Sequence, residues 1–227
     1  MQIAVVIPTL NEAALIGEAL GALQTLRAGG HLVVVVDGGS NDATRALAAP
    51  LADTVTCAAR GRARQMNAGA AAVAAHAYLF LHADTRLPEG AAAAIVAALA
   101  SGKHVWGRFD IRIEGRSRWL PVVAGLMNLR SRITGITTGD QAMFVTRAAF
   151  AAAGGFPEWP LMEDIGLSRA LKRQSGPAAL RLRVTTAGRR WDAQGPLRTI
   201  VIMWWLRLRF FLGAKPERLA ERYSAVR

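Results

Sequence analysis

The stretch VVVVDGGSND, residues 33–42, joins an uninterrupted apolar run to a turn of glycines and acids. Four consecutive valines predict a strand that is covered on both faces, as in a parallel sheet with helices on either side. Gly38 and Gly39 allow a ligand or backbone to approach closely, and Asp37 supplies a carboxylate that can accept hydrogen bonds. The same acid could instead cap the next helix, so this turn alone leaves binding and capping open.

Three more strand–helix pairs surround this stretch. The expected order is strand 3–7, helix from Asn11, strand 32–37, helix after residue 42, strand 54–58, helix within 61–77, strand 78–84 and helix 88–100. Repeated units of this kind build a mostly parallel sheet with right-handed crossovers. Ligands of such sheets bind at the carboxyl ends of the strands, and three of these four ends carry polar residues.

The second half of the chain has a different pattern. RFDIRIE, residues 108–114, alternates apolar and charged residues, which predicts a half-exposed and often antiparallel strand. A helix is expected over 120–133, and a short strand, a helix, a loop and another helix within 139–174. No linker interrupts the pattern, so we expect one α/β domain over 1–195 with a mixed sheet, followed by a helical tail over 196–227.

The composition is that of a globular protein with a strong basic excess. Of 227 residues, 52% are hydrophobic and 19% charged, and the formal net charge is +12. Such a charge attracts polyanions, which include nucleic acids, diphosphates and anionic membrane surfaces. Nucleic acid is not expected as a partner, because the aromatic residues outside the tail do not interleave with the basic ones as a stacking platform requires.

The cysteine content and the N-terminus point to a cytoplasmic protein. Cys57 is the single cysteine, so no internal disulfide can form, and we expect a buried thiol in a reducing compartment. The first residues read as a strand rather than a signal peptide, because Pro8, Asn11 and Glu12 interrupt the apolar run early. No apolar run has the roughly 20 residues of a membrane span.

Three common sites are excluded by their motifs. No G-x-G-x-x-G follows the first strand, and neither a G-x-x-x-x-G-K-[ST] loop nor a G-x-S-x-G elbow occurs. The remaining chemistry lies in carboxylates. Asp84 ends an apolar strand and could hold Mg²⁺ or Mn²⁺ with a diphosphate, with His82 on the same side of the extended chain. The alternative is that Asp84 caps the helix near Pro88.

A second pair of acids, Glu163 and Asp164, is expected at the start of a helix. The helix dipole favours acids there, so ordinary capping is one interpretation. The other is that one carboxylate serves as a general base for a hydroxyl nucleophile.

Five motifs in order resemble family 2 glycosyltransferases over nearly the whole chain. They are VVIPTLNE (5–12), VVDGGSNDAT (35–44), ARGRARQMNAGA (59–70), LFLHADT (79–85) and GGFPEWPLMEDIGLSRAL (154–171). The chain is most similar to a small bacterial subgroup described as "transferase 2, radical-SAM/selenodomain-associated". The resemblance implies a GT-A fold, a nucleotide-diphosphate-sugar donor and a divalent metal, Mg²⁺ or Mn²⁺.

The resemblance also assigns roles to individual residues. It implies a donor site formed by Pro8, Thr9, Leu10, Glu12, Asp37, Gly38, Ser40, Arg62, Arg64, Asn67 and Asp84. It implies an acceptor side formed by Gly139, Asp140, Gln141 and Glu163. Asp164 matches the general base of inverting members, and Asp84 matches the last acid of the metal-binding D-x-D signature.

Two positions depart from the family pattern. His82 stands where D-x-D has its first acid, so the metal is expected on Asp84, with His82 as a less certain ligand. Met66 precedes Asn67 where the family often has arginine. Arg62 and Arg64 are nearby, and their planar guanidinium groups are suited to binding a diphosphate.

The tail contains an apolar, aromatic stretch at 199–212. It is too short to span a membrane, but its arginines, tryptophans and phenylalanines suit a helix lying in a membrane interface. Packing on the domain or a homodimer contact is the alternative. If the tail binds lipid, the protein is peripheral on the inner face of the membrane and a lipid-linked acceptor becomes a candidate.

Two other functions are weighed against glycosyl transfer. A nucleotidyltransferase would need a glycine-rich, lysine-containing loop after the first strand, and PTLNEA does not supply one. A non-catalytic nucleotide or nucleic-acid binder would use the arginine excess alone.

Overall fold

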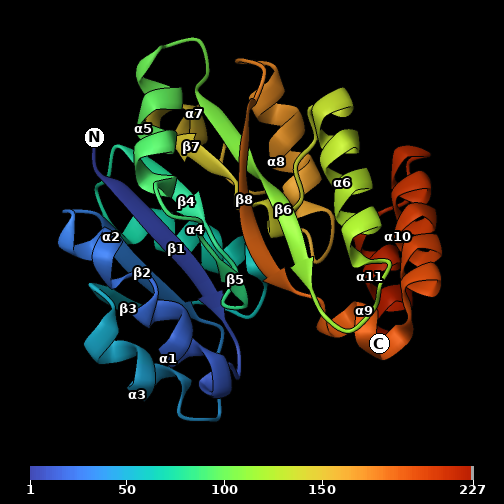
Figure 1. Ribbon diagram of the computed structural model, residues 1–227, viewed down its shortest axis with the longest axis horizontal. Coiled ribbons are helices and arrows are strands. Elements are labelled where there is room, and N and C mark those ends of the chain that lie inside the picture. Colours follow the sequence, from blue (N-terminus) through green and yellow to red (C-terminus); the bar gives the residue numbers. More distant parts are fainter. Residues whose placement is uncertain (226–227) are drawn as a thin grey trace.

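A computed structural model describes residues 1–225, except for the side chains at positions 190, 193, 194, 196, 197, 224 and 225. Within this range the chain forms a mixed sheet in the order β3-β2-β1-β4-β7-β6-β8-β5, with helices on both faces (Figure 1). The strands are β1 (Ile3–Thr9), β2 (Leu32–Asp37), β3 (Thr54–Cys57), β4 (Ala77–Phe80), β5 (Thr85–Arg86), β6 (Trp106–Glu114), β7 (Phe144–Thr146) and β8 (Ala178–Ala187).

The helices are α1 (Ala13–Gly21), α2 (Gln24–Ala28), α3 (Thr44–Ala48), α4 (Arg62–Ala72), α5 (Ala91–Ala100), α6 (Leu120–Thr134), α7 (Arg147–Ala152), α8 (Glu163–Lys172), α9 (Arg189–Gln194), α10 (Pro196–Phe211) and α11 (Pro216–Ala225). Each predicted helix is present, and α2 and α9 are helices that were not predicted from the sequence. Two short 3-10 turns are η1 (Ala49–Leu51) and η2 (Gly139–Gln141). The predicted α/β class is confirmed.

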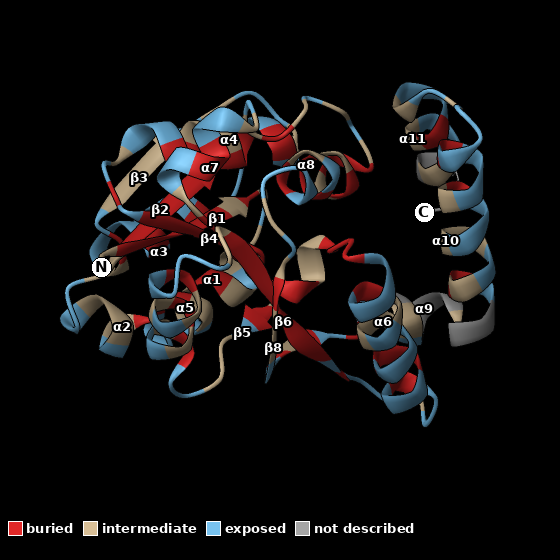
Figure 2. Cartoon of the chain, turned by 90° about the horizontal axis from the view of Figure 1, so that it is seen from above, coloured by how far each residue is buried: buried red, intermediate tan, exposed pale blue. Residues whose placement is uncertain are grey.

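The valine strand β2 lies inside the parallel half of the sheet. It pairs in parallel with β1 and β3, and β1 pairs in parallel with β4. Val33 and Val35 belong to the apolar core on one face of the sheet, and Val34 and Val36 to the core on the other. All four are fully buried, because helices cover both faces (Figure 2).

The antiparallel part begins where β4 meets β7, and β7 pairs in the same way with β6. The strand predicted to run to residue 84 ends at Phe80 instead. His82 and Asp84 therefore lie in the short connection between β4 and β5, beyond the carboxyl end of β4.

The prediction that residues 108–114 form a half-exposed strand is wrong at two charged positions. Arg108 and Asp110 are both buried in β6, because α6 packs over this face. Asp110 forms ion pairs with Arg108 and with Arg132 of α6. The amide of Asn128 bonds to both the N–H and the C=O of Ile111, which ties α6 to the strand. The ion pairs and the amide make burial of charge tolerable here.

The prediction of a buried thiol is also wrong. Cys57 is exposed, because β3 is the edge strand of the sheet and Cys57 is its last residue.

The C-terminal helices pack on the domain through a separate apolar cluster. Leu206 and Phe210 of α10 and Leu219 of α11 join Met162 and Ile165 at the start of α8. None of the helices that the structure describes has the length and apolarity needed to cross a membrane.

Gly69 sets how closely α4 approaches the sheet. A Cβ at this position would lie 2.4 Å from Cγ1 of Val6 and 2.8 Å from Cγ2 of Val36. We expect Gly69→Ala to lower the free energy of unfolding by about 1–3 kcal/mol, because neither buried valine can move away freely. Chemical denaturation measures this change.

The matched control is Gly17→Ala in α1, where nothing lies within 4 Å of the added Cβ. That substitution should be neutral or stabilise the protein by up to ~1 kcal/mol, through helix propensity and reduced freedom of the unfolded chain. Equal effects of the two substitutions would contradict the packing argument.

Candidate active site

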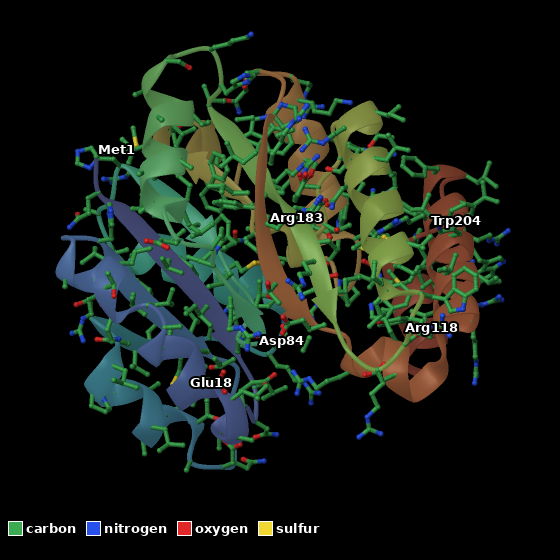
Figure 3. The ribbon with its side chains drawn as sticks, viewed as in Figure 1. Met1, Glu18, Asp84, Arg118, Arg183 and Trp204 are labelled. Carbon is green, nitrogen blue, oxygen red and sulfur yellow. The ribbon has the colours of Figure 1, made fainter. Side chains whose placement is uncertain are left out.

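A cavity of about 810 Å³ opens beyond the carboxyl ends of β1 and β4 and extends between α6, α8 and α10. Figure 3 shows Asp84, one of its lining residues, at the end of the sheet away from Met1. The predicted site residues that line this cavity are Pro8, Glu12, Arg62, His82, Asp84, Gly139, Asp140, Glu163 and Asp164. Both acidic motifs therefore face one space, although about 80 residues separate them in sequence.

Asp84 interacts with an arginine that we did not predict. Nη2 of Arg189 lies 3.1 Å from Oδ2 of Asp84 and 4.0 Å from Oε2 of Glu12. Burial raises the pKa of Glu12, and the charge of Arg189 partly opposes that shift. Arg189 follows β8 directly, so it brings a cation from the second half of the chain to the acids of the first half.

His82 is held in place by the η2 turn. Its Nδ1 lies 3.4 Å from Oδ1 of Asp140, and a Cβ at Gly139 would lie 2.7 Å from the imidazole ring. Only glycine therefore fits at position 139 while His82 keeps this place. The tight packing limits how far His82 can turn toward a ligand.

The acids at the start of α8 have unusual environments. Asp164 accepts hydrogen bonds from the Gly139 N–H at 3.0 Å and from its own helix at the Ile165 N–H, 2.7 Å. Burial raises the pKa of Asp164 despite these bonds. Burial, together with the charge of Asp164, raises the pKa of Glu163 to about 7. A carboxylate of raised pKa is a better proton acceptor, as a general base requires.

Asp37 lies outside the lining of the cavity, and its carboxylate is satisfied locally. It accepts hydrogen bonds from the Gly39 N–H at 3.0 Å and the Ser40 N–H at 2.8 Å. Burial would raise the pKa of Asp37, but the bonds from Ser40 and Gly39 outweigh it and lower the pKa. The buried carboxylate orders the turn that follows β2.

The neighbouring strand ends are tied together in the same way. Nε2 of Gln65 donates to the carbonyl oxygens of Thr9 and Val36, both at 2.8 Å. The hydroxyl of Ser40 accepts from the Asn11 N–H at 2.8 Å. Thr9, Leu10, Gly38 and Ser40 thus form an ordered edge beside the cavity rather than part of its wall.

Three further predicted residues have partners elsewhere and do not line the cavity. Arg64 forms an exposed ion pair with Glu158 at 3.1 Å. The Asn67 side chain exchanges two hydrogen bonds with the backbone of Phe156. Gln141 is fully buried and accepts from the Thr138 N–H within the η2 turn.

Sequence reasoning missed the wall of the cavity that α6 and α10 supply. Arg130 and Arg207 line it, together with apolar side chains of both helices, including Leu126, Met127, Ile200 and Met203. The helical spacing in 120–133 and 199–212 was the available signal. It indicates which residues share a face, but not which face turns toward a cavity.

The residues of the cavity could hold a divalent metal only together with ligands from outside the protein. Among the described residues, no three His, Cys, Asp or Glu side chains gather closely enough to hold a metal ion. Mg²⁺ and Mn²⁺ sites in transferases often use one or two carboxylates, with water and substrate phosphates completing the shell. Asp84, with His82 two residues before it, fits that type of site.

The comparison with protein families gives a match over the first two thirds of the chain. Residues 4–152 match the model of "Glycosyl transferase family 2". The chain belongs to glycosyl transferase family 2. The match extends from β1 to the end of α7, and so includes Glu12, Asp37 and Asp84. No sequence among the curated proteins matches the chain.

Solved structures of similar fold support the GT-A prediction for this family 2 chain. TarS from S. aureus, residues 1–349, superposes with a TM-score of 0.67 at 17% identity, over 83% of this chain and 61% of the other. The mannosyltransferase PcManGT from Pyrobaculum calidifontis, in complex with GDP-Man and Mn²⁺, gives 0.63 at 23% identity, over 81% and 56%. This chain spans less than two thirds of either protein.

A third similar structure is glucosyl-3-phosphoglycerate synthase from Mycobacterium tuberculosis, in complex with Mn²⁺, UDP and phosphoglyceric acid. It gives a TM-score of 0.61 at 20% identity, over 82% of this chain and 69% of the other. At these identities the likeness establishes the fold, and the GT-A fold predicted for the chain is confirmed.

The raised pKa of Glu163 predicts a pH-dependent stability. The Glu163 carboxyl binds its proton more tightly in the folded protein than in the unfolded chain, where its pKa is near 4.5. The stability from protonated Glu163 is therefore complete below about pH 4.5 and lost as the pH rises through 7. Glu163→Gln, which stays neutral, should gain up to about 3 kcal/mol relative to the parent between pH 5 and pH 8. Denaturant unfolding at both pH values measures the difference.

Glu89→Gln, at an exposed position, is the matched control. If Glu163→Gln and Glu89→Gln show the same pH dependence, Glu163 does not carry the proton in this range.

Proposed function

We propose that the protein transfers a glycosyl group from a nucleoside-diphosphate sugar to an acceptor hydroxyl, with inversion at the anomeric carbon. The observation that carries this proposal is the pair of acids on one cavity. Asp84 lies beyond a strand end and pairs with Arg189, and Asp164, whose pKa is raised, lines the same cavity. Membership of glycosyl transferase family 2 agrees with this chemistry.

The donor is proposed to bind along the ends of β1, β2 and β4. The nucleoside would lie against the ordered edge around Asp37, and the diphosphate near Asp84 and Arg62. We infer that Asp84, with His82 as a second candidate ligand, would hold Mg²⁺ or Mn²⁺. A divalent cation at this place would neutralise charge on the diphosphate leaving group. Arg62 and Arg189 provide fixed positive charge on the same side of the cavity.

The acceptor is proposed to bind between η2, α8, α6 and α10. Asp164 takes the proton from the acceptor hydroxyl as its oxygen attacks the anomeric carbon. The bond from that carbon to the diphosphate oxygen breaks, and the leaving group carries the electron pair away. Asp140 and Glu163 line the same side, and the Gly139 N–H holds Asp164 in position. Such a base contributes roughly 10²–10⁴-fold to the rate.

The finer assignments belong to this proposal as well. They are membership of the radical-SAM/selenodomain-associated subgroup, the division into a domain over 1–195 and a tail over 196–227, and a cytoplasmic location. The sugar, the base and the acceptor are left open. The nucleotidyltransferase and nucleic-acid-binding alternatives gain no support from the arrangement of the cavity.

The role of Asp164 is tested by Asp164→Asn. We expect turnover to fall at least ~100-fold, because the amide cannot accept the proton while its shape is preserved. The measurement is release of UDP or GDP from a panel of sugar donors. Binding of the nucleotide with Mn²⁺, followed by thermal shift, should be unchanged because Asp164 lies on the acceptor side.

Asp84→Ala is the complementary variant, and it should weaken nucleotide binding in the presence of Mn²⁺. Near-normal turnover of Asp164→Asn would remove that residue from the mechanism. If no nucleoside diphosphate stabilises the unmodified protein, with or without Mn²⁺, the donor class itself is wrong.

We further propose that the protein binds anionic membrane surfaces through α10 and α6. Along α10 and at its C-cap, the apolar side chains Val201, Trp204, Leu208 and Leu212 are 57–72% exposed. On α6, Leu129 and Ile133 are also exposed, at 54% and 76%. Trp204, Leu129 and Ile133 also line the cavity, so a membrane touching this surface would lie at the proposed acceptor side.

Charge complementarity favours lipid over a second protein copy as the occupant of this surface. Arg198 and Arg209 are exposed on α10 among the apolar residues, and the chain carries a net charge of +12. Basic and aromatic residues together are typical of helices in membrane interfaces. Figure 2 shows α10 along the outer side of the molecule, away from the sheet. A lipid-linked acceptor would reach the cavity directly from such a surface.

The surface is tested by the double substitution Val201→Asp and Leu208→Asp, neither of which lines the cavity. We expect flotation with phosphatidylglycerol vesicles to fall ~10-fold or more, because two side chains that would enter the interface become charged. Leu47→Asp is the control, an exposed leucine on α3 at the other side of the sheet. Absence of flotation by the unmodified protein, or a dimer that buries α10, would contradict membrane binding.

A further inference from the structure

The cavity contains two arginines whose side-chain nitrogens are only partly satisfied by the described part of the chain. Arg130 comes from α6 and Arg207 from α10, and both line the space beside Asp164. Nε and Nη2 of Arg130 and Nε of Arg207 are shielded from solvent, with no hydrogen-bond partner in the described part of the chain. Nor does either guanidinium form an ion pair there, whereas the fully buried Arg108 of β6 is paired with Asp110.

The energetics of this arrangement are unfavourable without a bound anion. Burial lowers the pKa of Arg130 to about 10, and repulsion from Arg207 adds to the effect. Burial also lowers the pKa of Arg207, with Asp164 and Asp140 as the opposing charges. Two cations that repel each other in a partly desolvated wall cost free energy unless a negative group joins them.

The place of the two arginines separates them from the donor side. Arg207 interacts electrostatically with Asp164 and Asp140, whereas Arg62 acts on Glu12 and Arg189 pairs with Asp84. Asp164 therefore acts on Arg130 and Arg207, whereas Asp84 pairs with Arg189. The proposed diphosphate would meet the positive charge near Asp84, and the shielded nitrogens of Arg130 and Arg207 remain without a hydrogen-bond partner among the described residues.

Building on the proposed function, we propose that Arg130 and Arg207 form an anion subsite that binds a phosphate group of the acceptor. Both side chains line the cavity, and a guanidinium group has five N–H donors available to a ligand that enters it. Guanidinium groups bind phosphate oxygens through paired, charge-assisted hydrogen bonds. The phosphate anchors the acceptor so that one of its hydroxyls lies against Asp164.

The apolar residues around the subsite limit which other ligands suit it. Leu126, Met127 and Met203 line the same wall, so the phosphate site is not a generally polar surface. A phosphate in this position is either the headgroup of a lipid, whose chains follow the apolar wall, or part of a water-soluble phosphorylated acceptor. Both kinds of acceptor carry a phosphate group that Arg130 and Arg207 can bind.

The test compares Arg130→Gln, Arg207→Gln and a control, Arg173→Gln, an exposed arginine that lies outside the cavity. Calorimetric titration with glycerol 3-phosphate and flotation with phosphatidylglycerol vesicles serve as the two probes. We expect Arg130→Gln and Arg207→Gln to weaken binding of one of the two probes ~10–100-fold, which is the loss that removal of one charged hydrogen bond causes. Arg173→Gln should leave that binding unchanged. Loss of glycerol 3-phosphate binding identifies a soluble acceptor, and loss of vesicle binding a lipid.

Two further measurements distinguish this proposal from its alternatives. Nucleotide binding with Mn²⁺ should be unchanged in both variants, so its loss would assign the arginines to the donor and overturn the subsite. The thermal midpoint should stay the same or rise, because an uncompensated buried charge is removed. If neither probe binds more weakly to the two variants than to Arg173→Gln, the subsite is wrong, even where nucleotide binding supports the proposed function.

Discussion

Burial of β2 on both faces is the constraint on which the rest of the structure depends. Val33 to Val36 can be removed from water only if helices cover the sheet above and below. Parallel strands with such helices need crossover connections, and these carry every strand end of the first half to one edge. The acids that follow β1, β2 and β4 therefore gather without any direct attraction between them.

The same constraint explains why the two halves of the site differ in character. The proposed donor side rests on strand ends whose turns are fixed by hydrogen bonds, such as those of Gln65 to Thr9 and Val36. The proposed acceptor side consists of faces of α6 and α10, held by apolar contacts and by Asn128. Under this proposal, substitutions on those helices can change the acceptor while the sheet keeps the donor site.

Most of the sheet and the acids of the site could be predicted, because apolar runs and the residues after them are local features. Asp84 and Asp164 share a cavity as their motifs implied. Failures occurred where tertiary packing decides. Arg108 and Asp110 are buried because α6 covers a face whose alternation indicated solvent, and Cys57 is exposed because β3 is an edge. Propensity and pattern do not contain that information.

The two arginines of the acceptor side illustrate the same limit most clearly. In sequence, Arg130 and Arg207 cannot be distinguished from the many exposed arginines of this basic chain. Their significance depends on two helices far apart in sequence turning them toward Asp164, where no carboxylate of the described residues pairs with them. Unpaired charge inside a cavity is a property of the assembled fold. A partly buried cation that the fold leaves unpaired indicates a ligand more strongly than its residue type does.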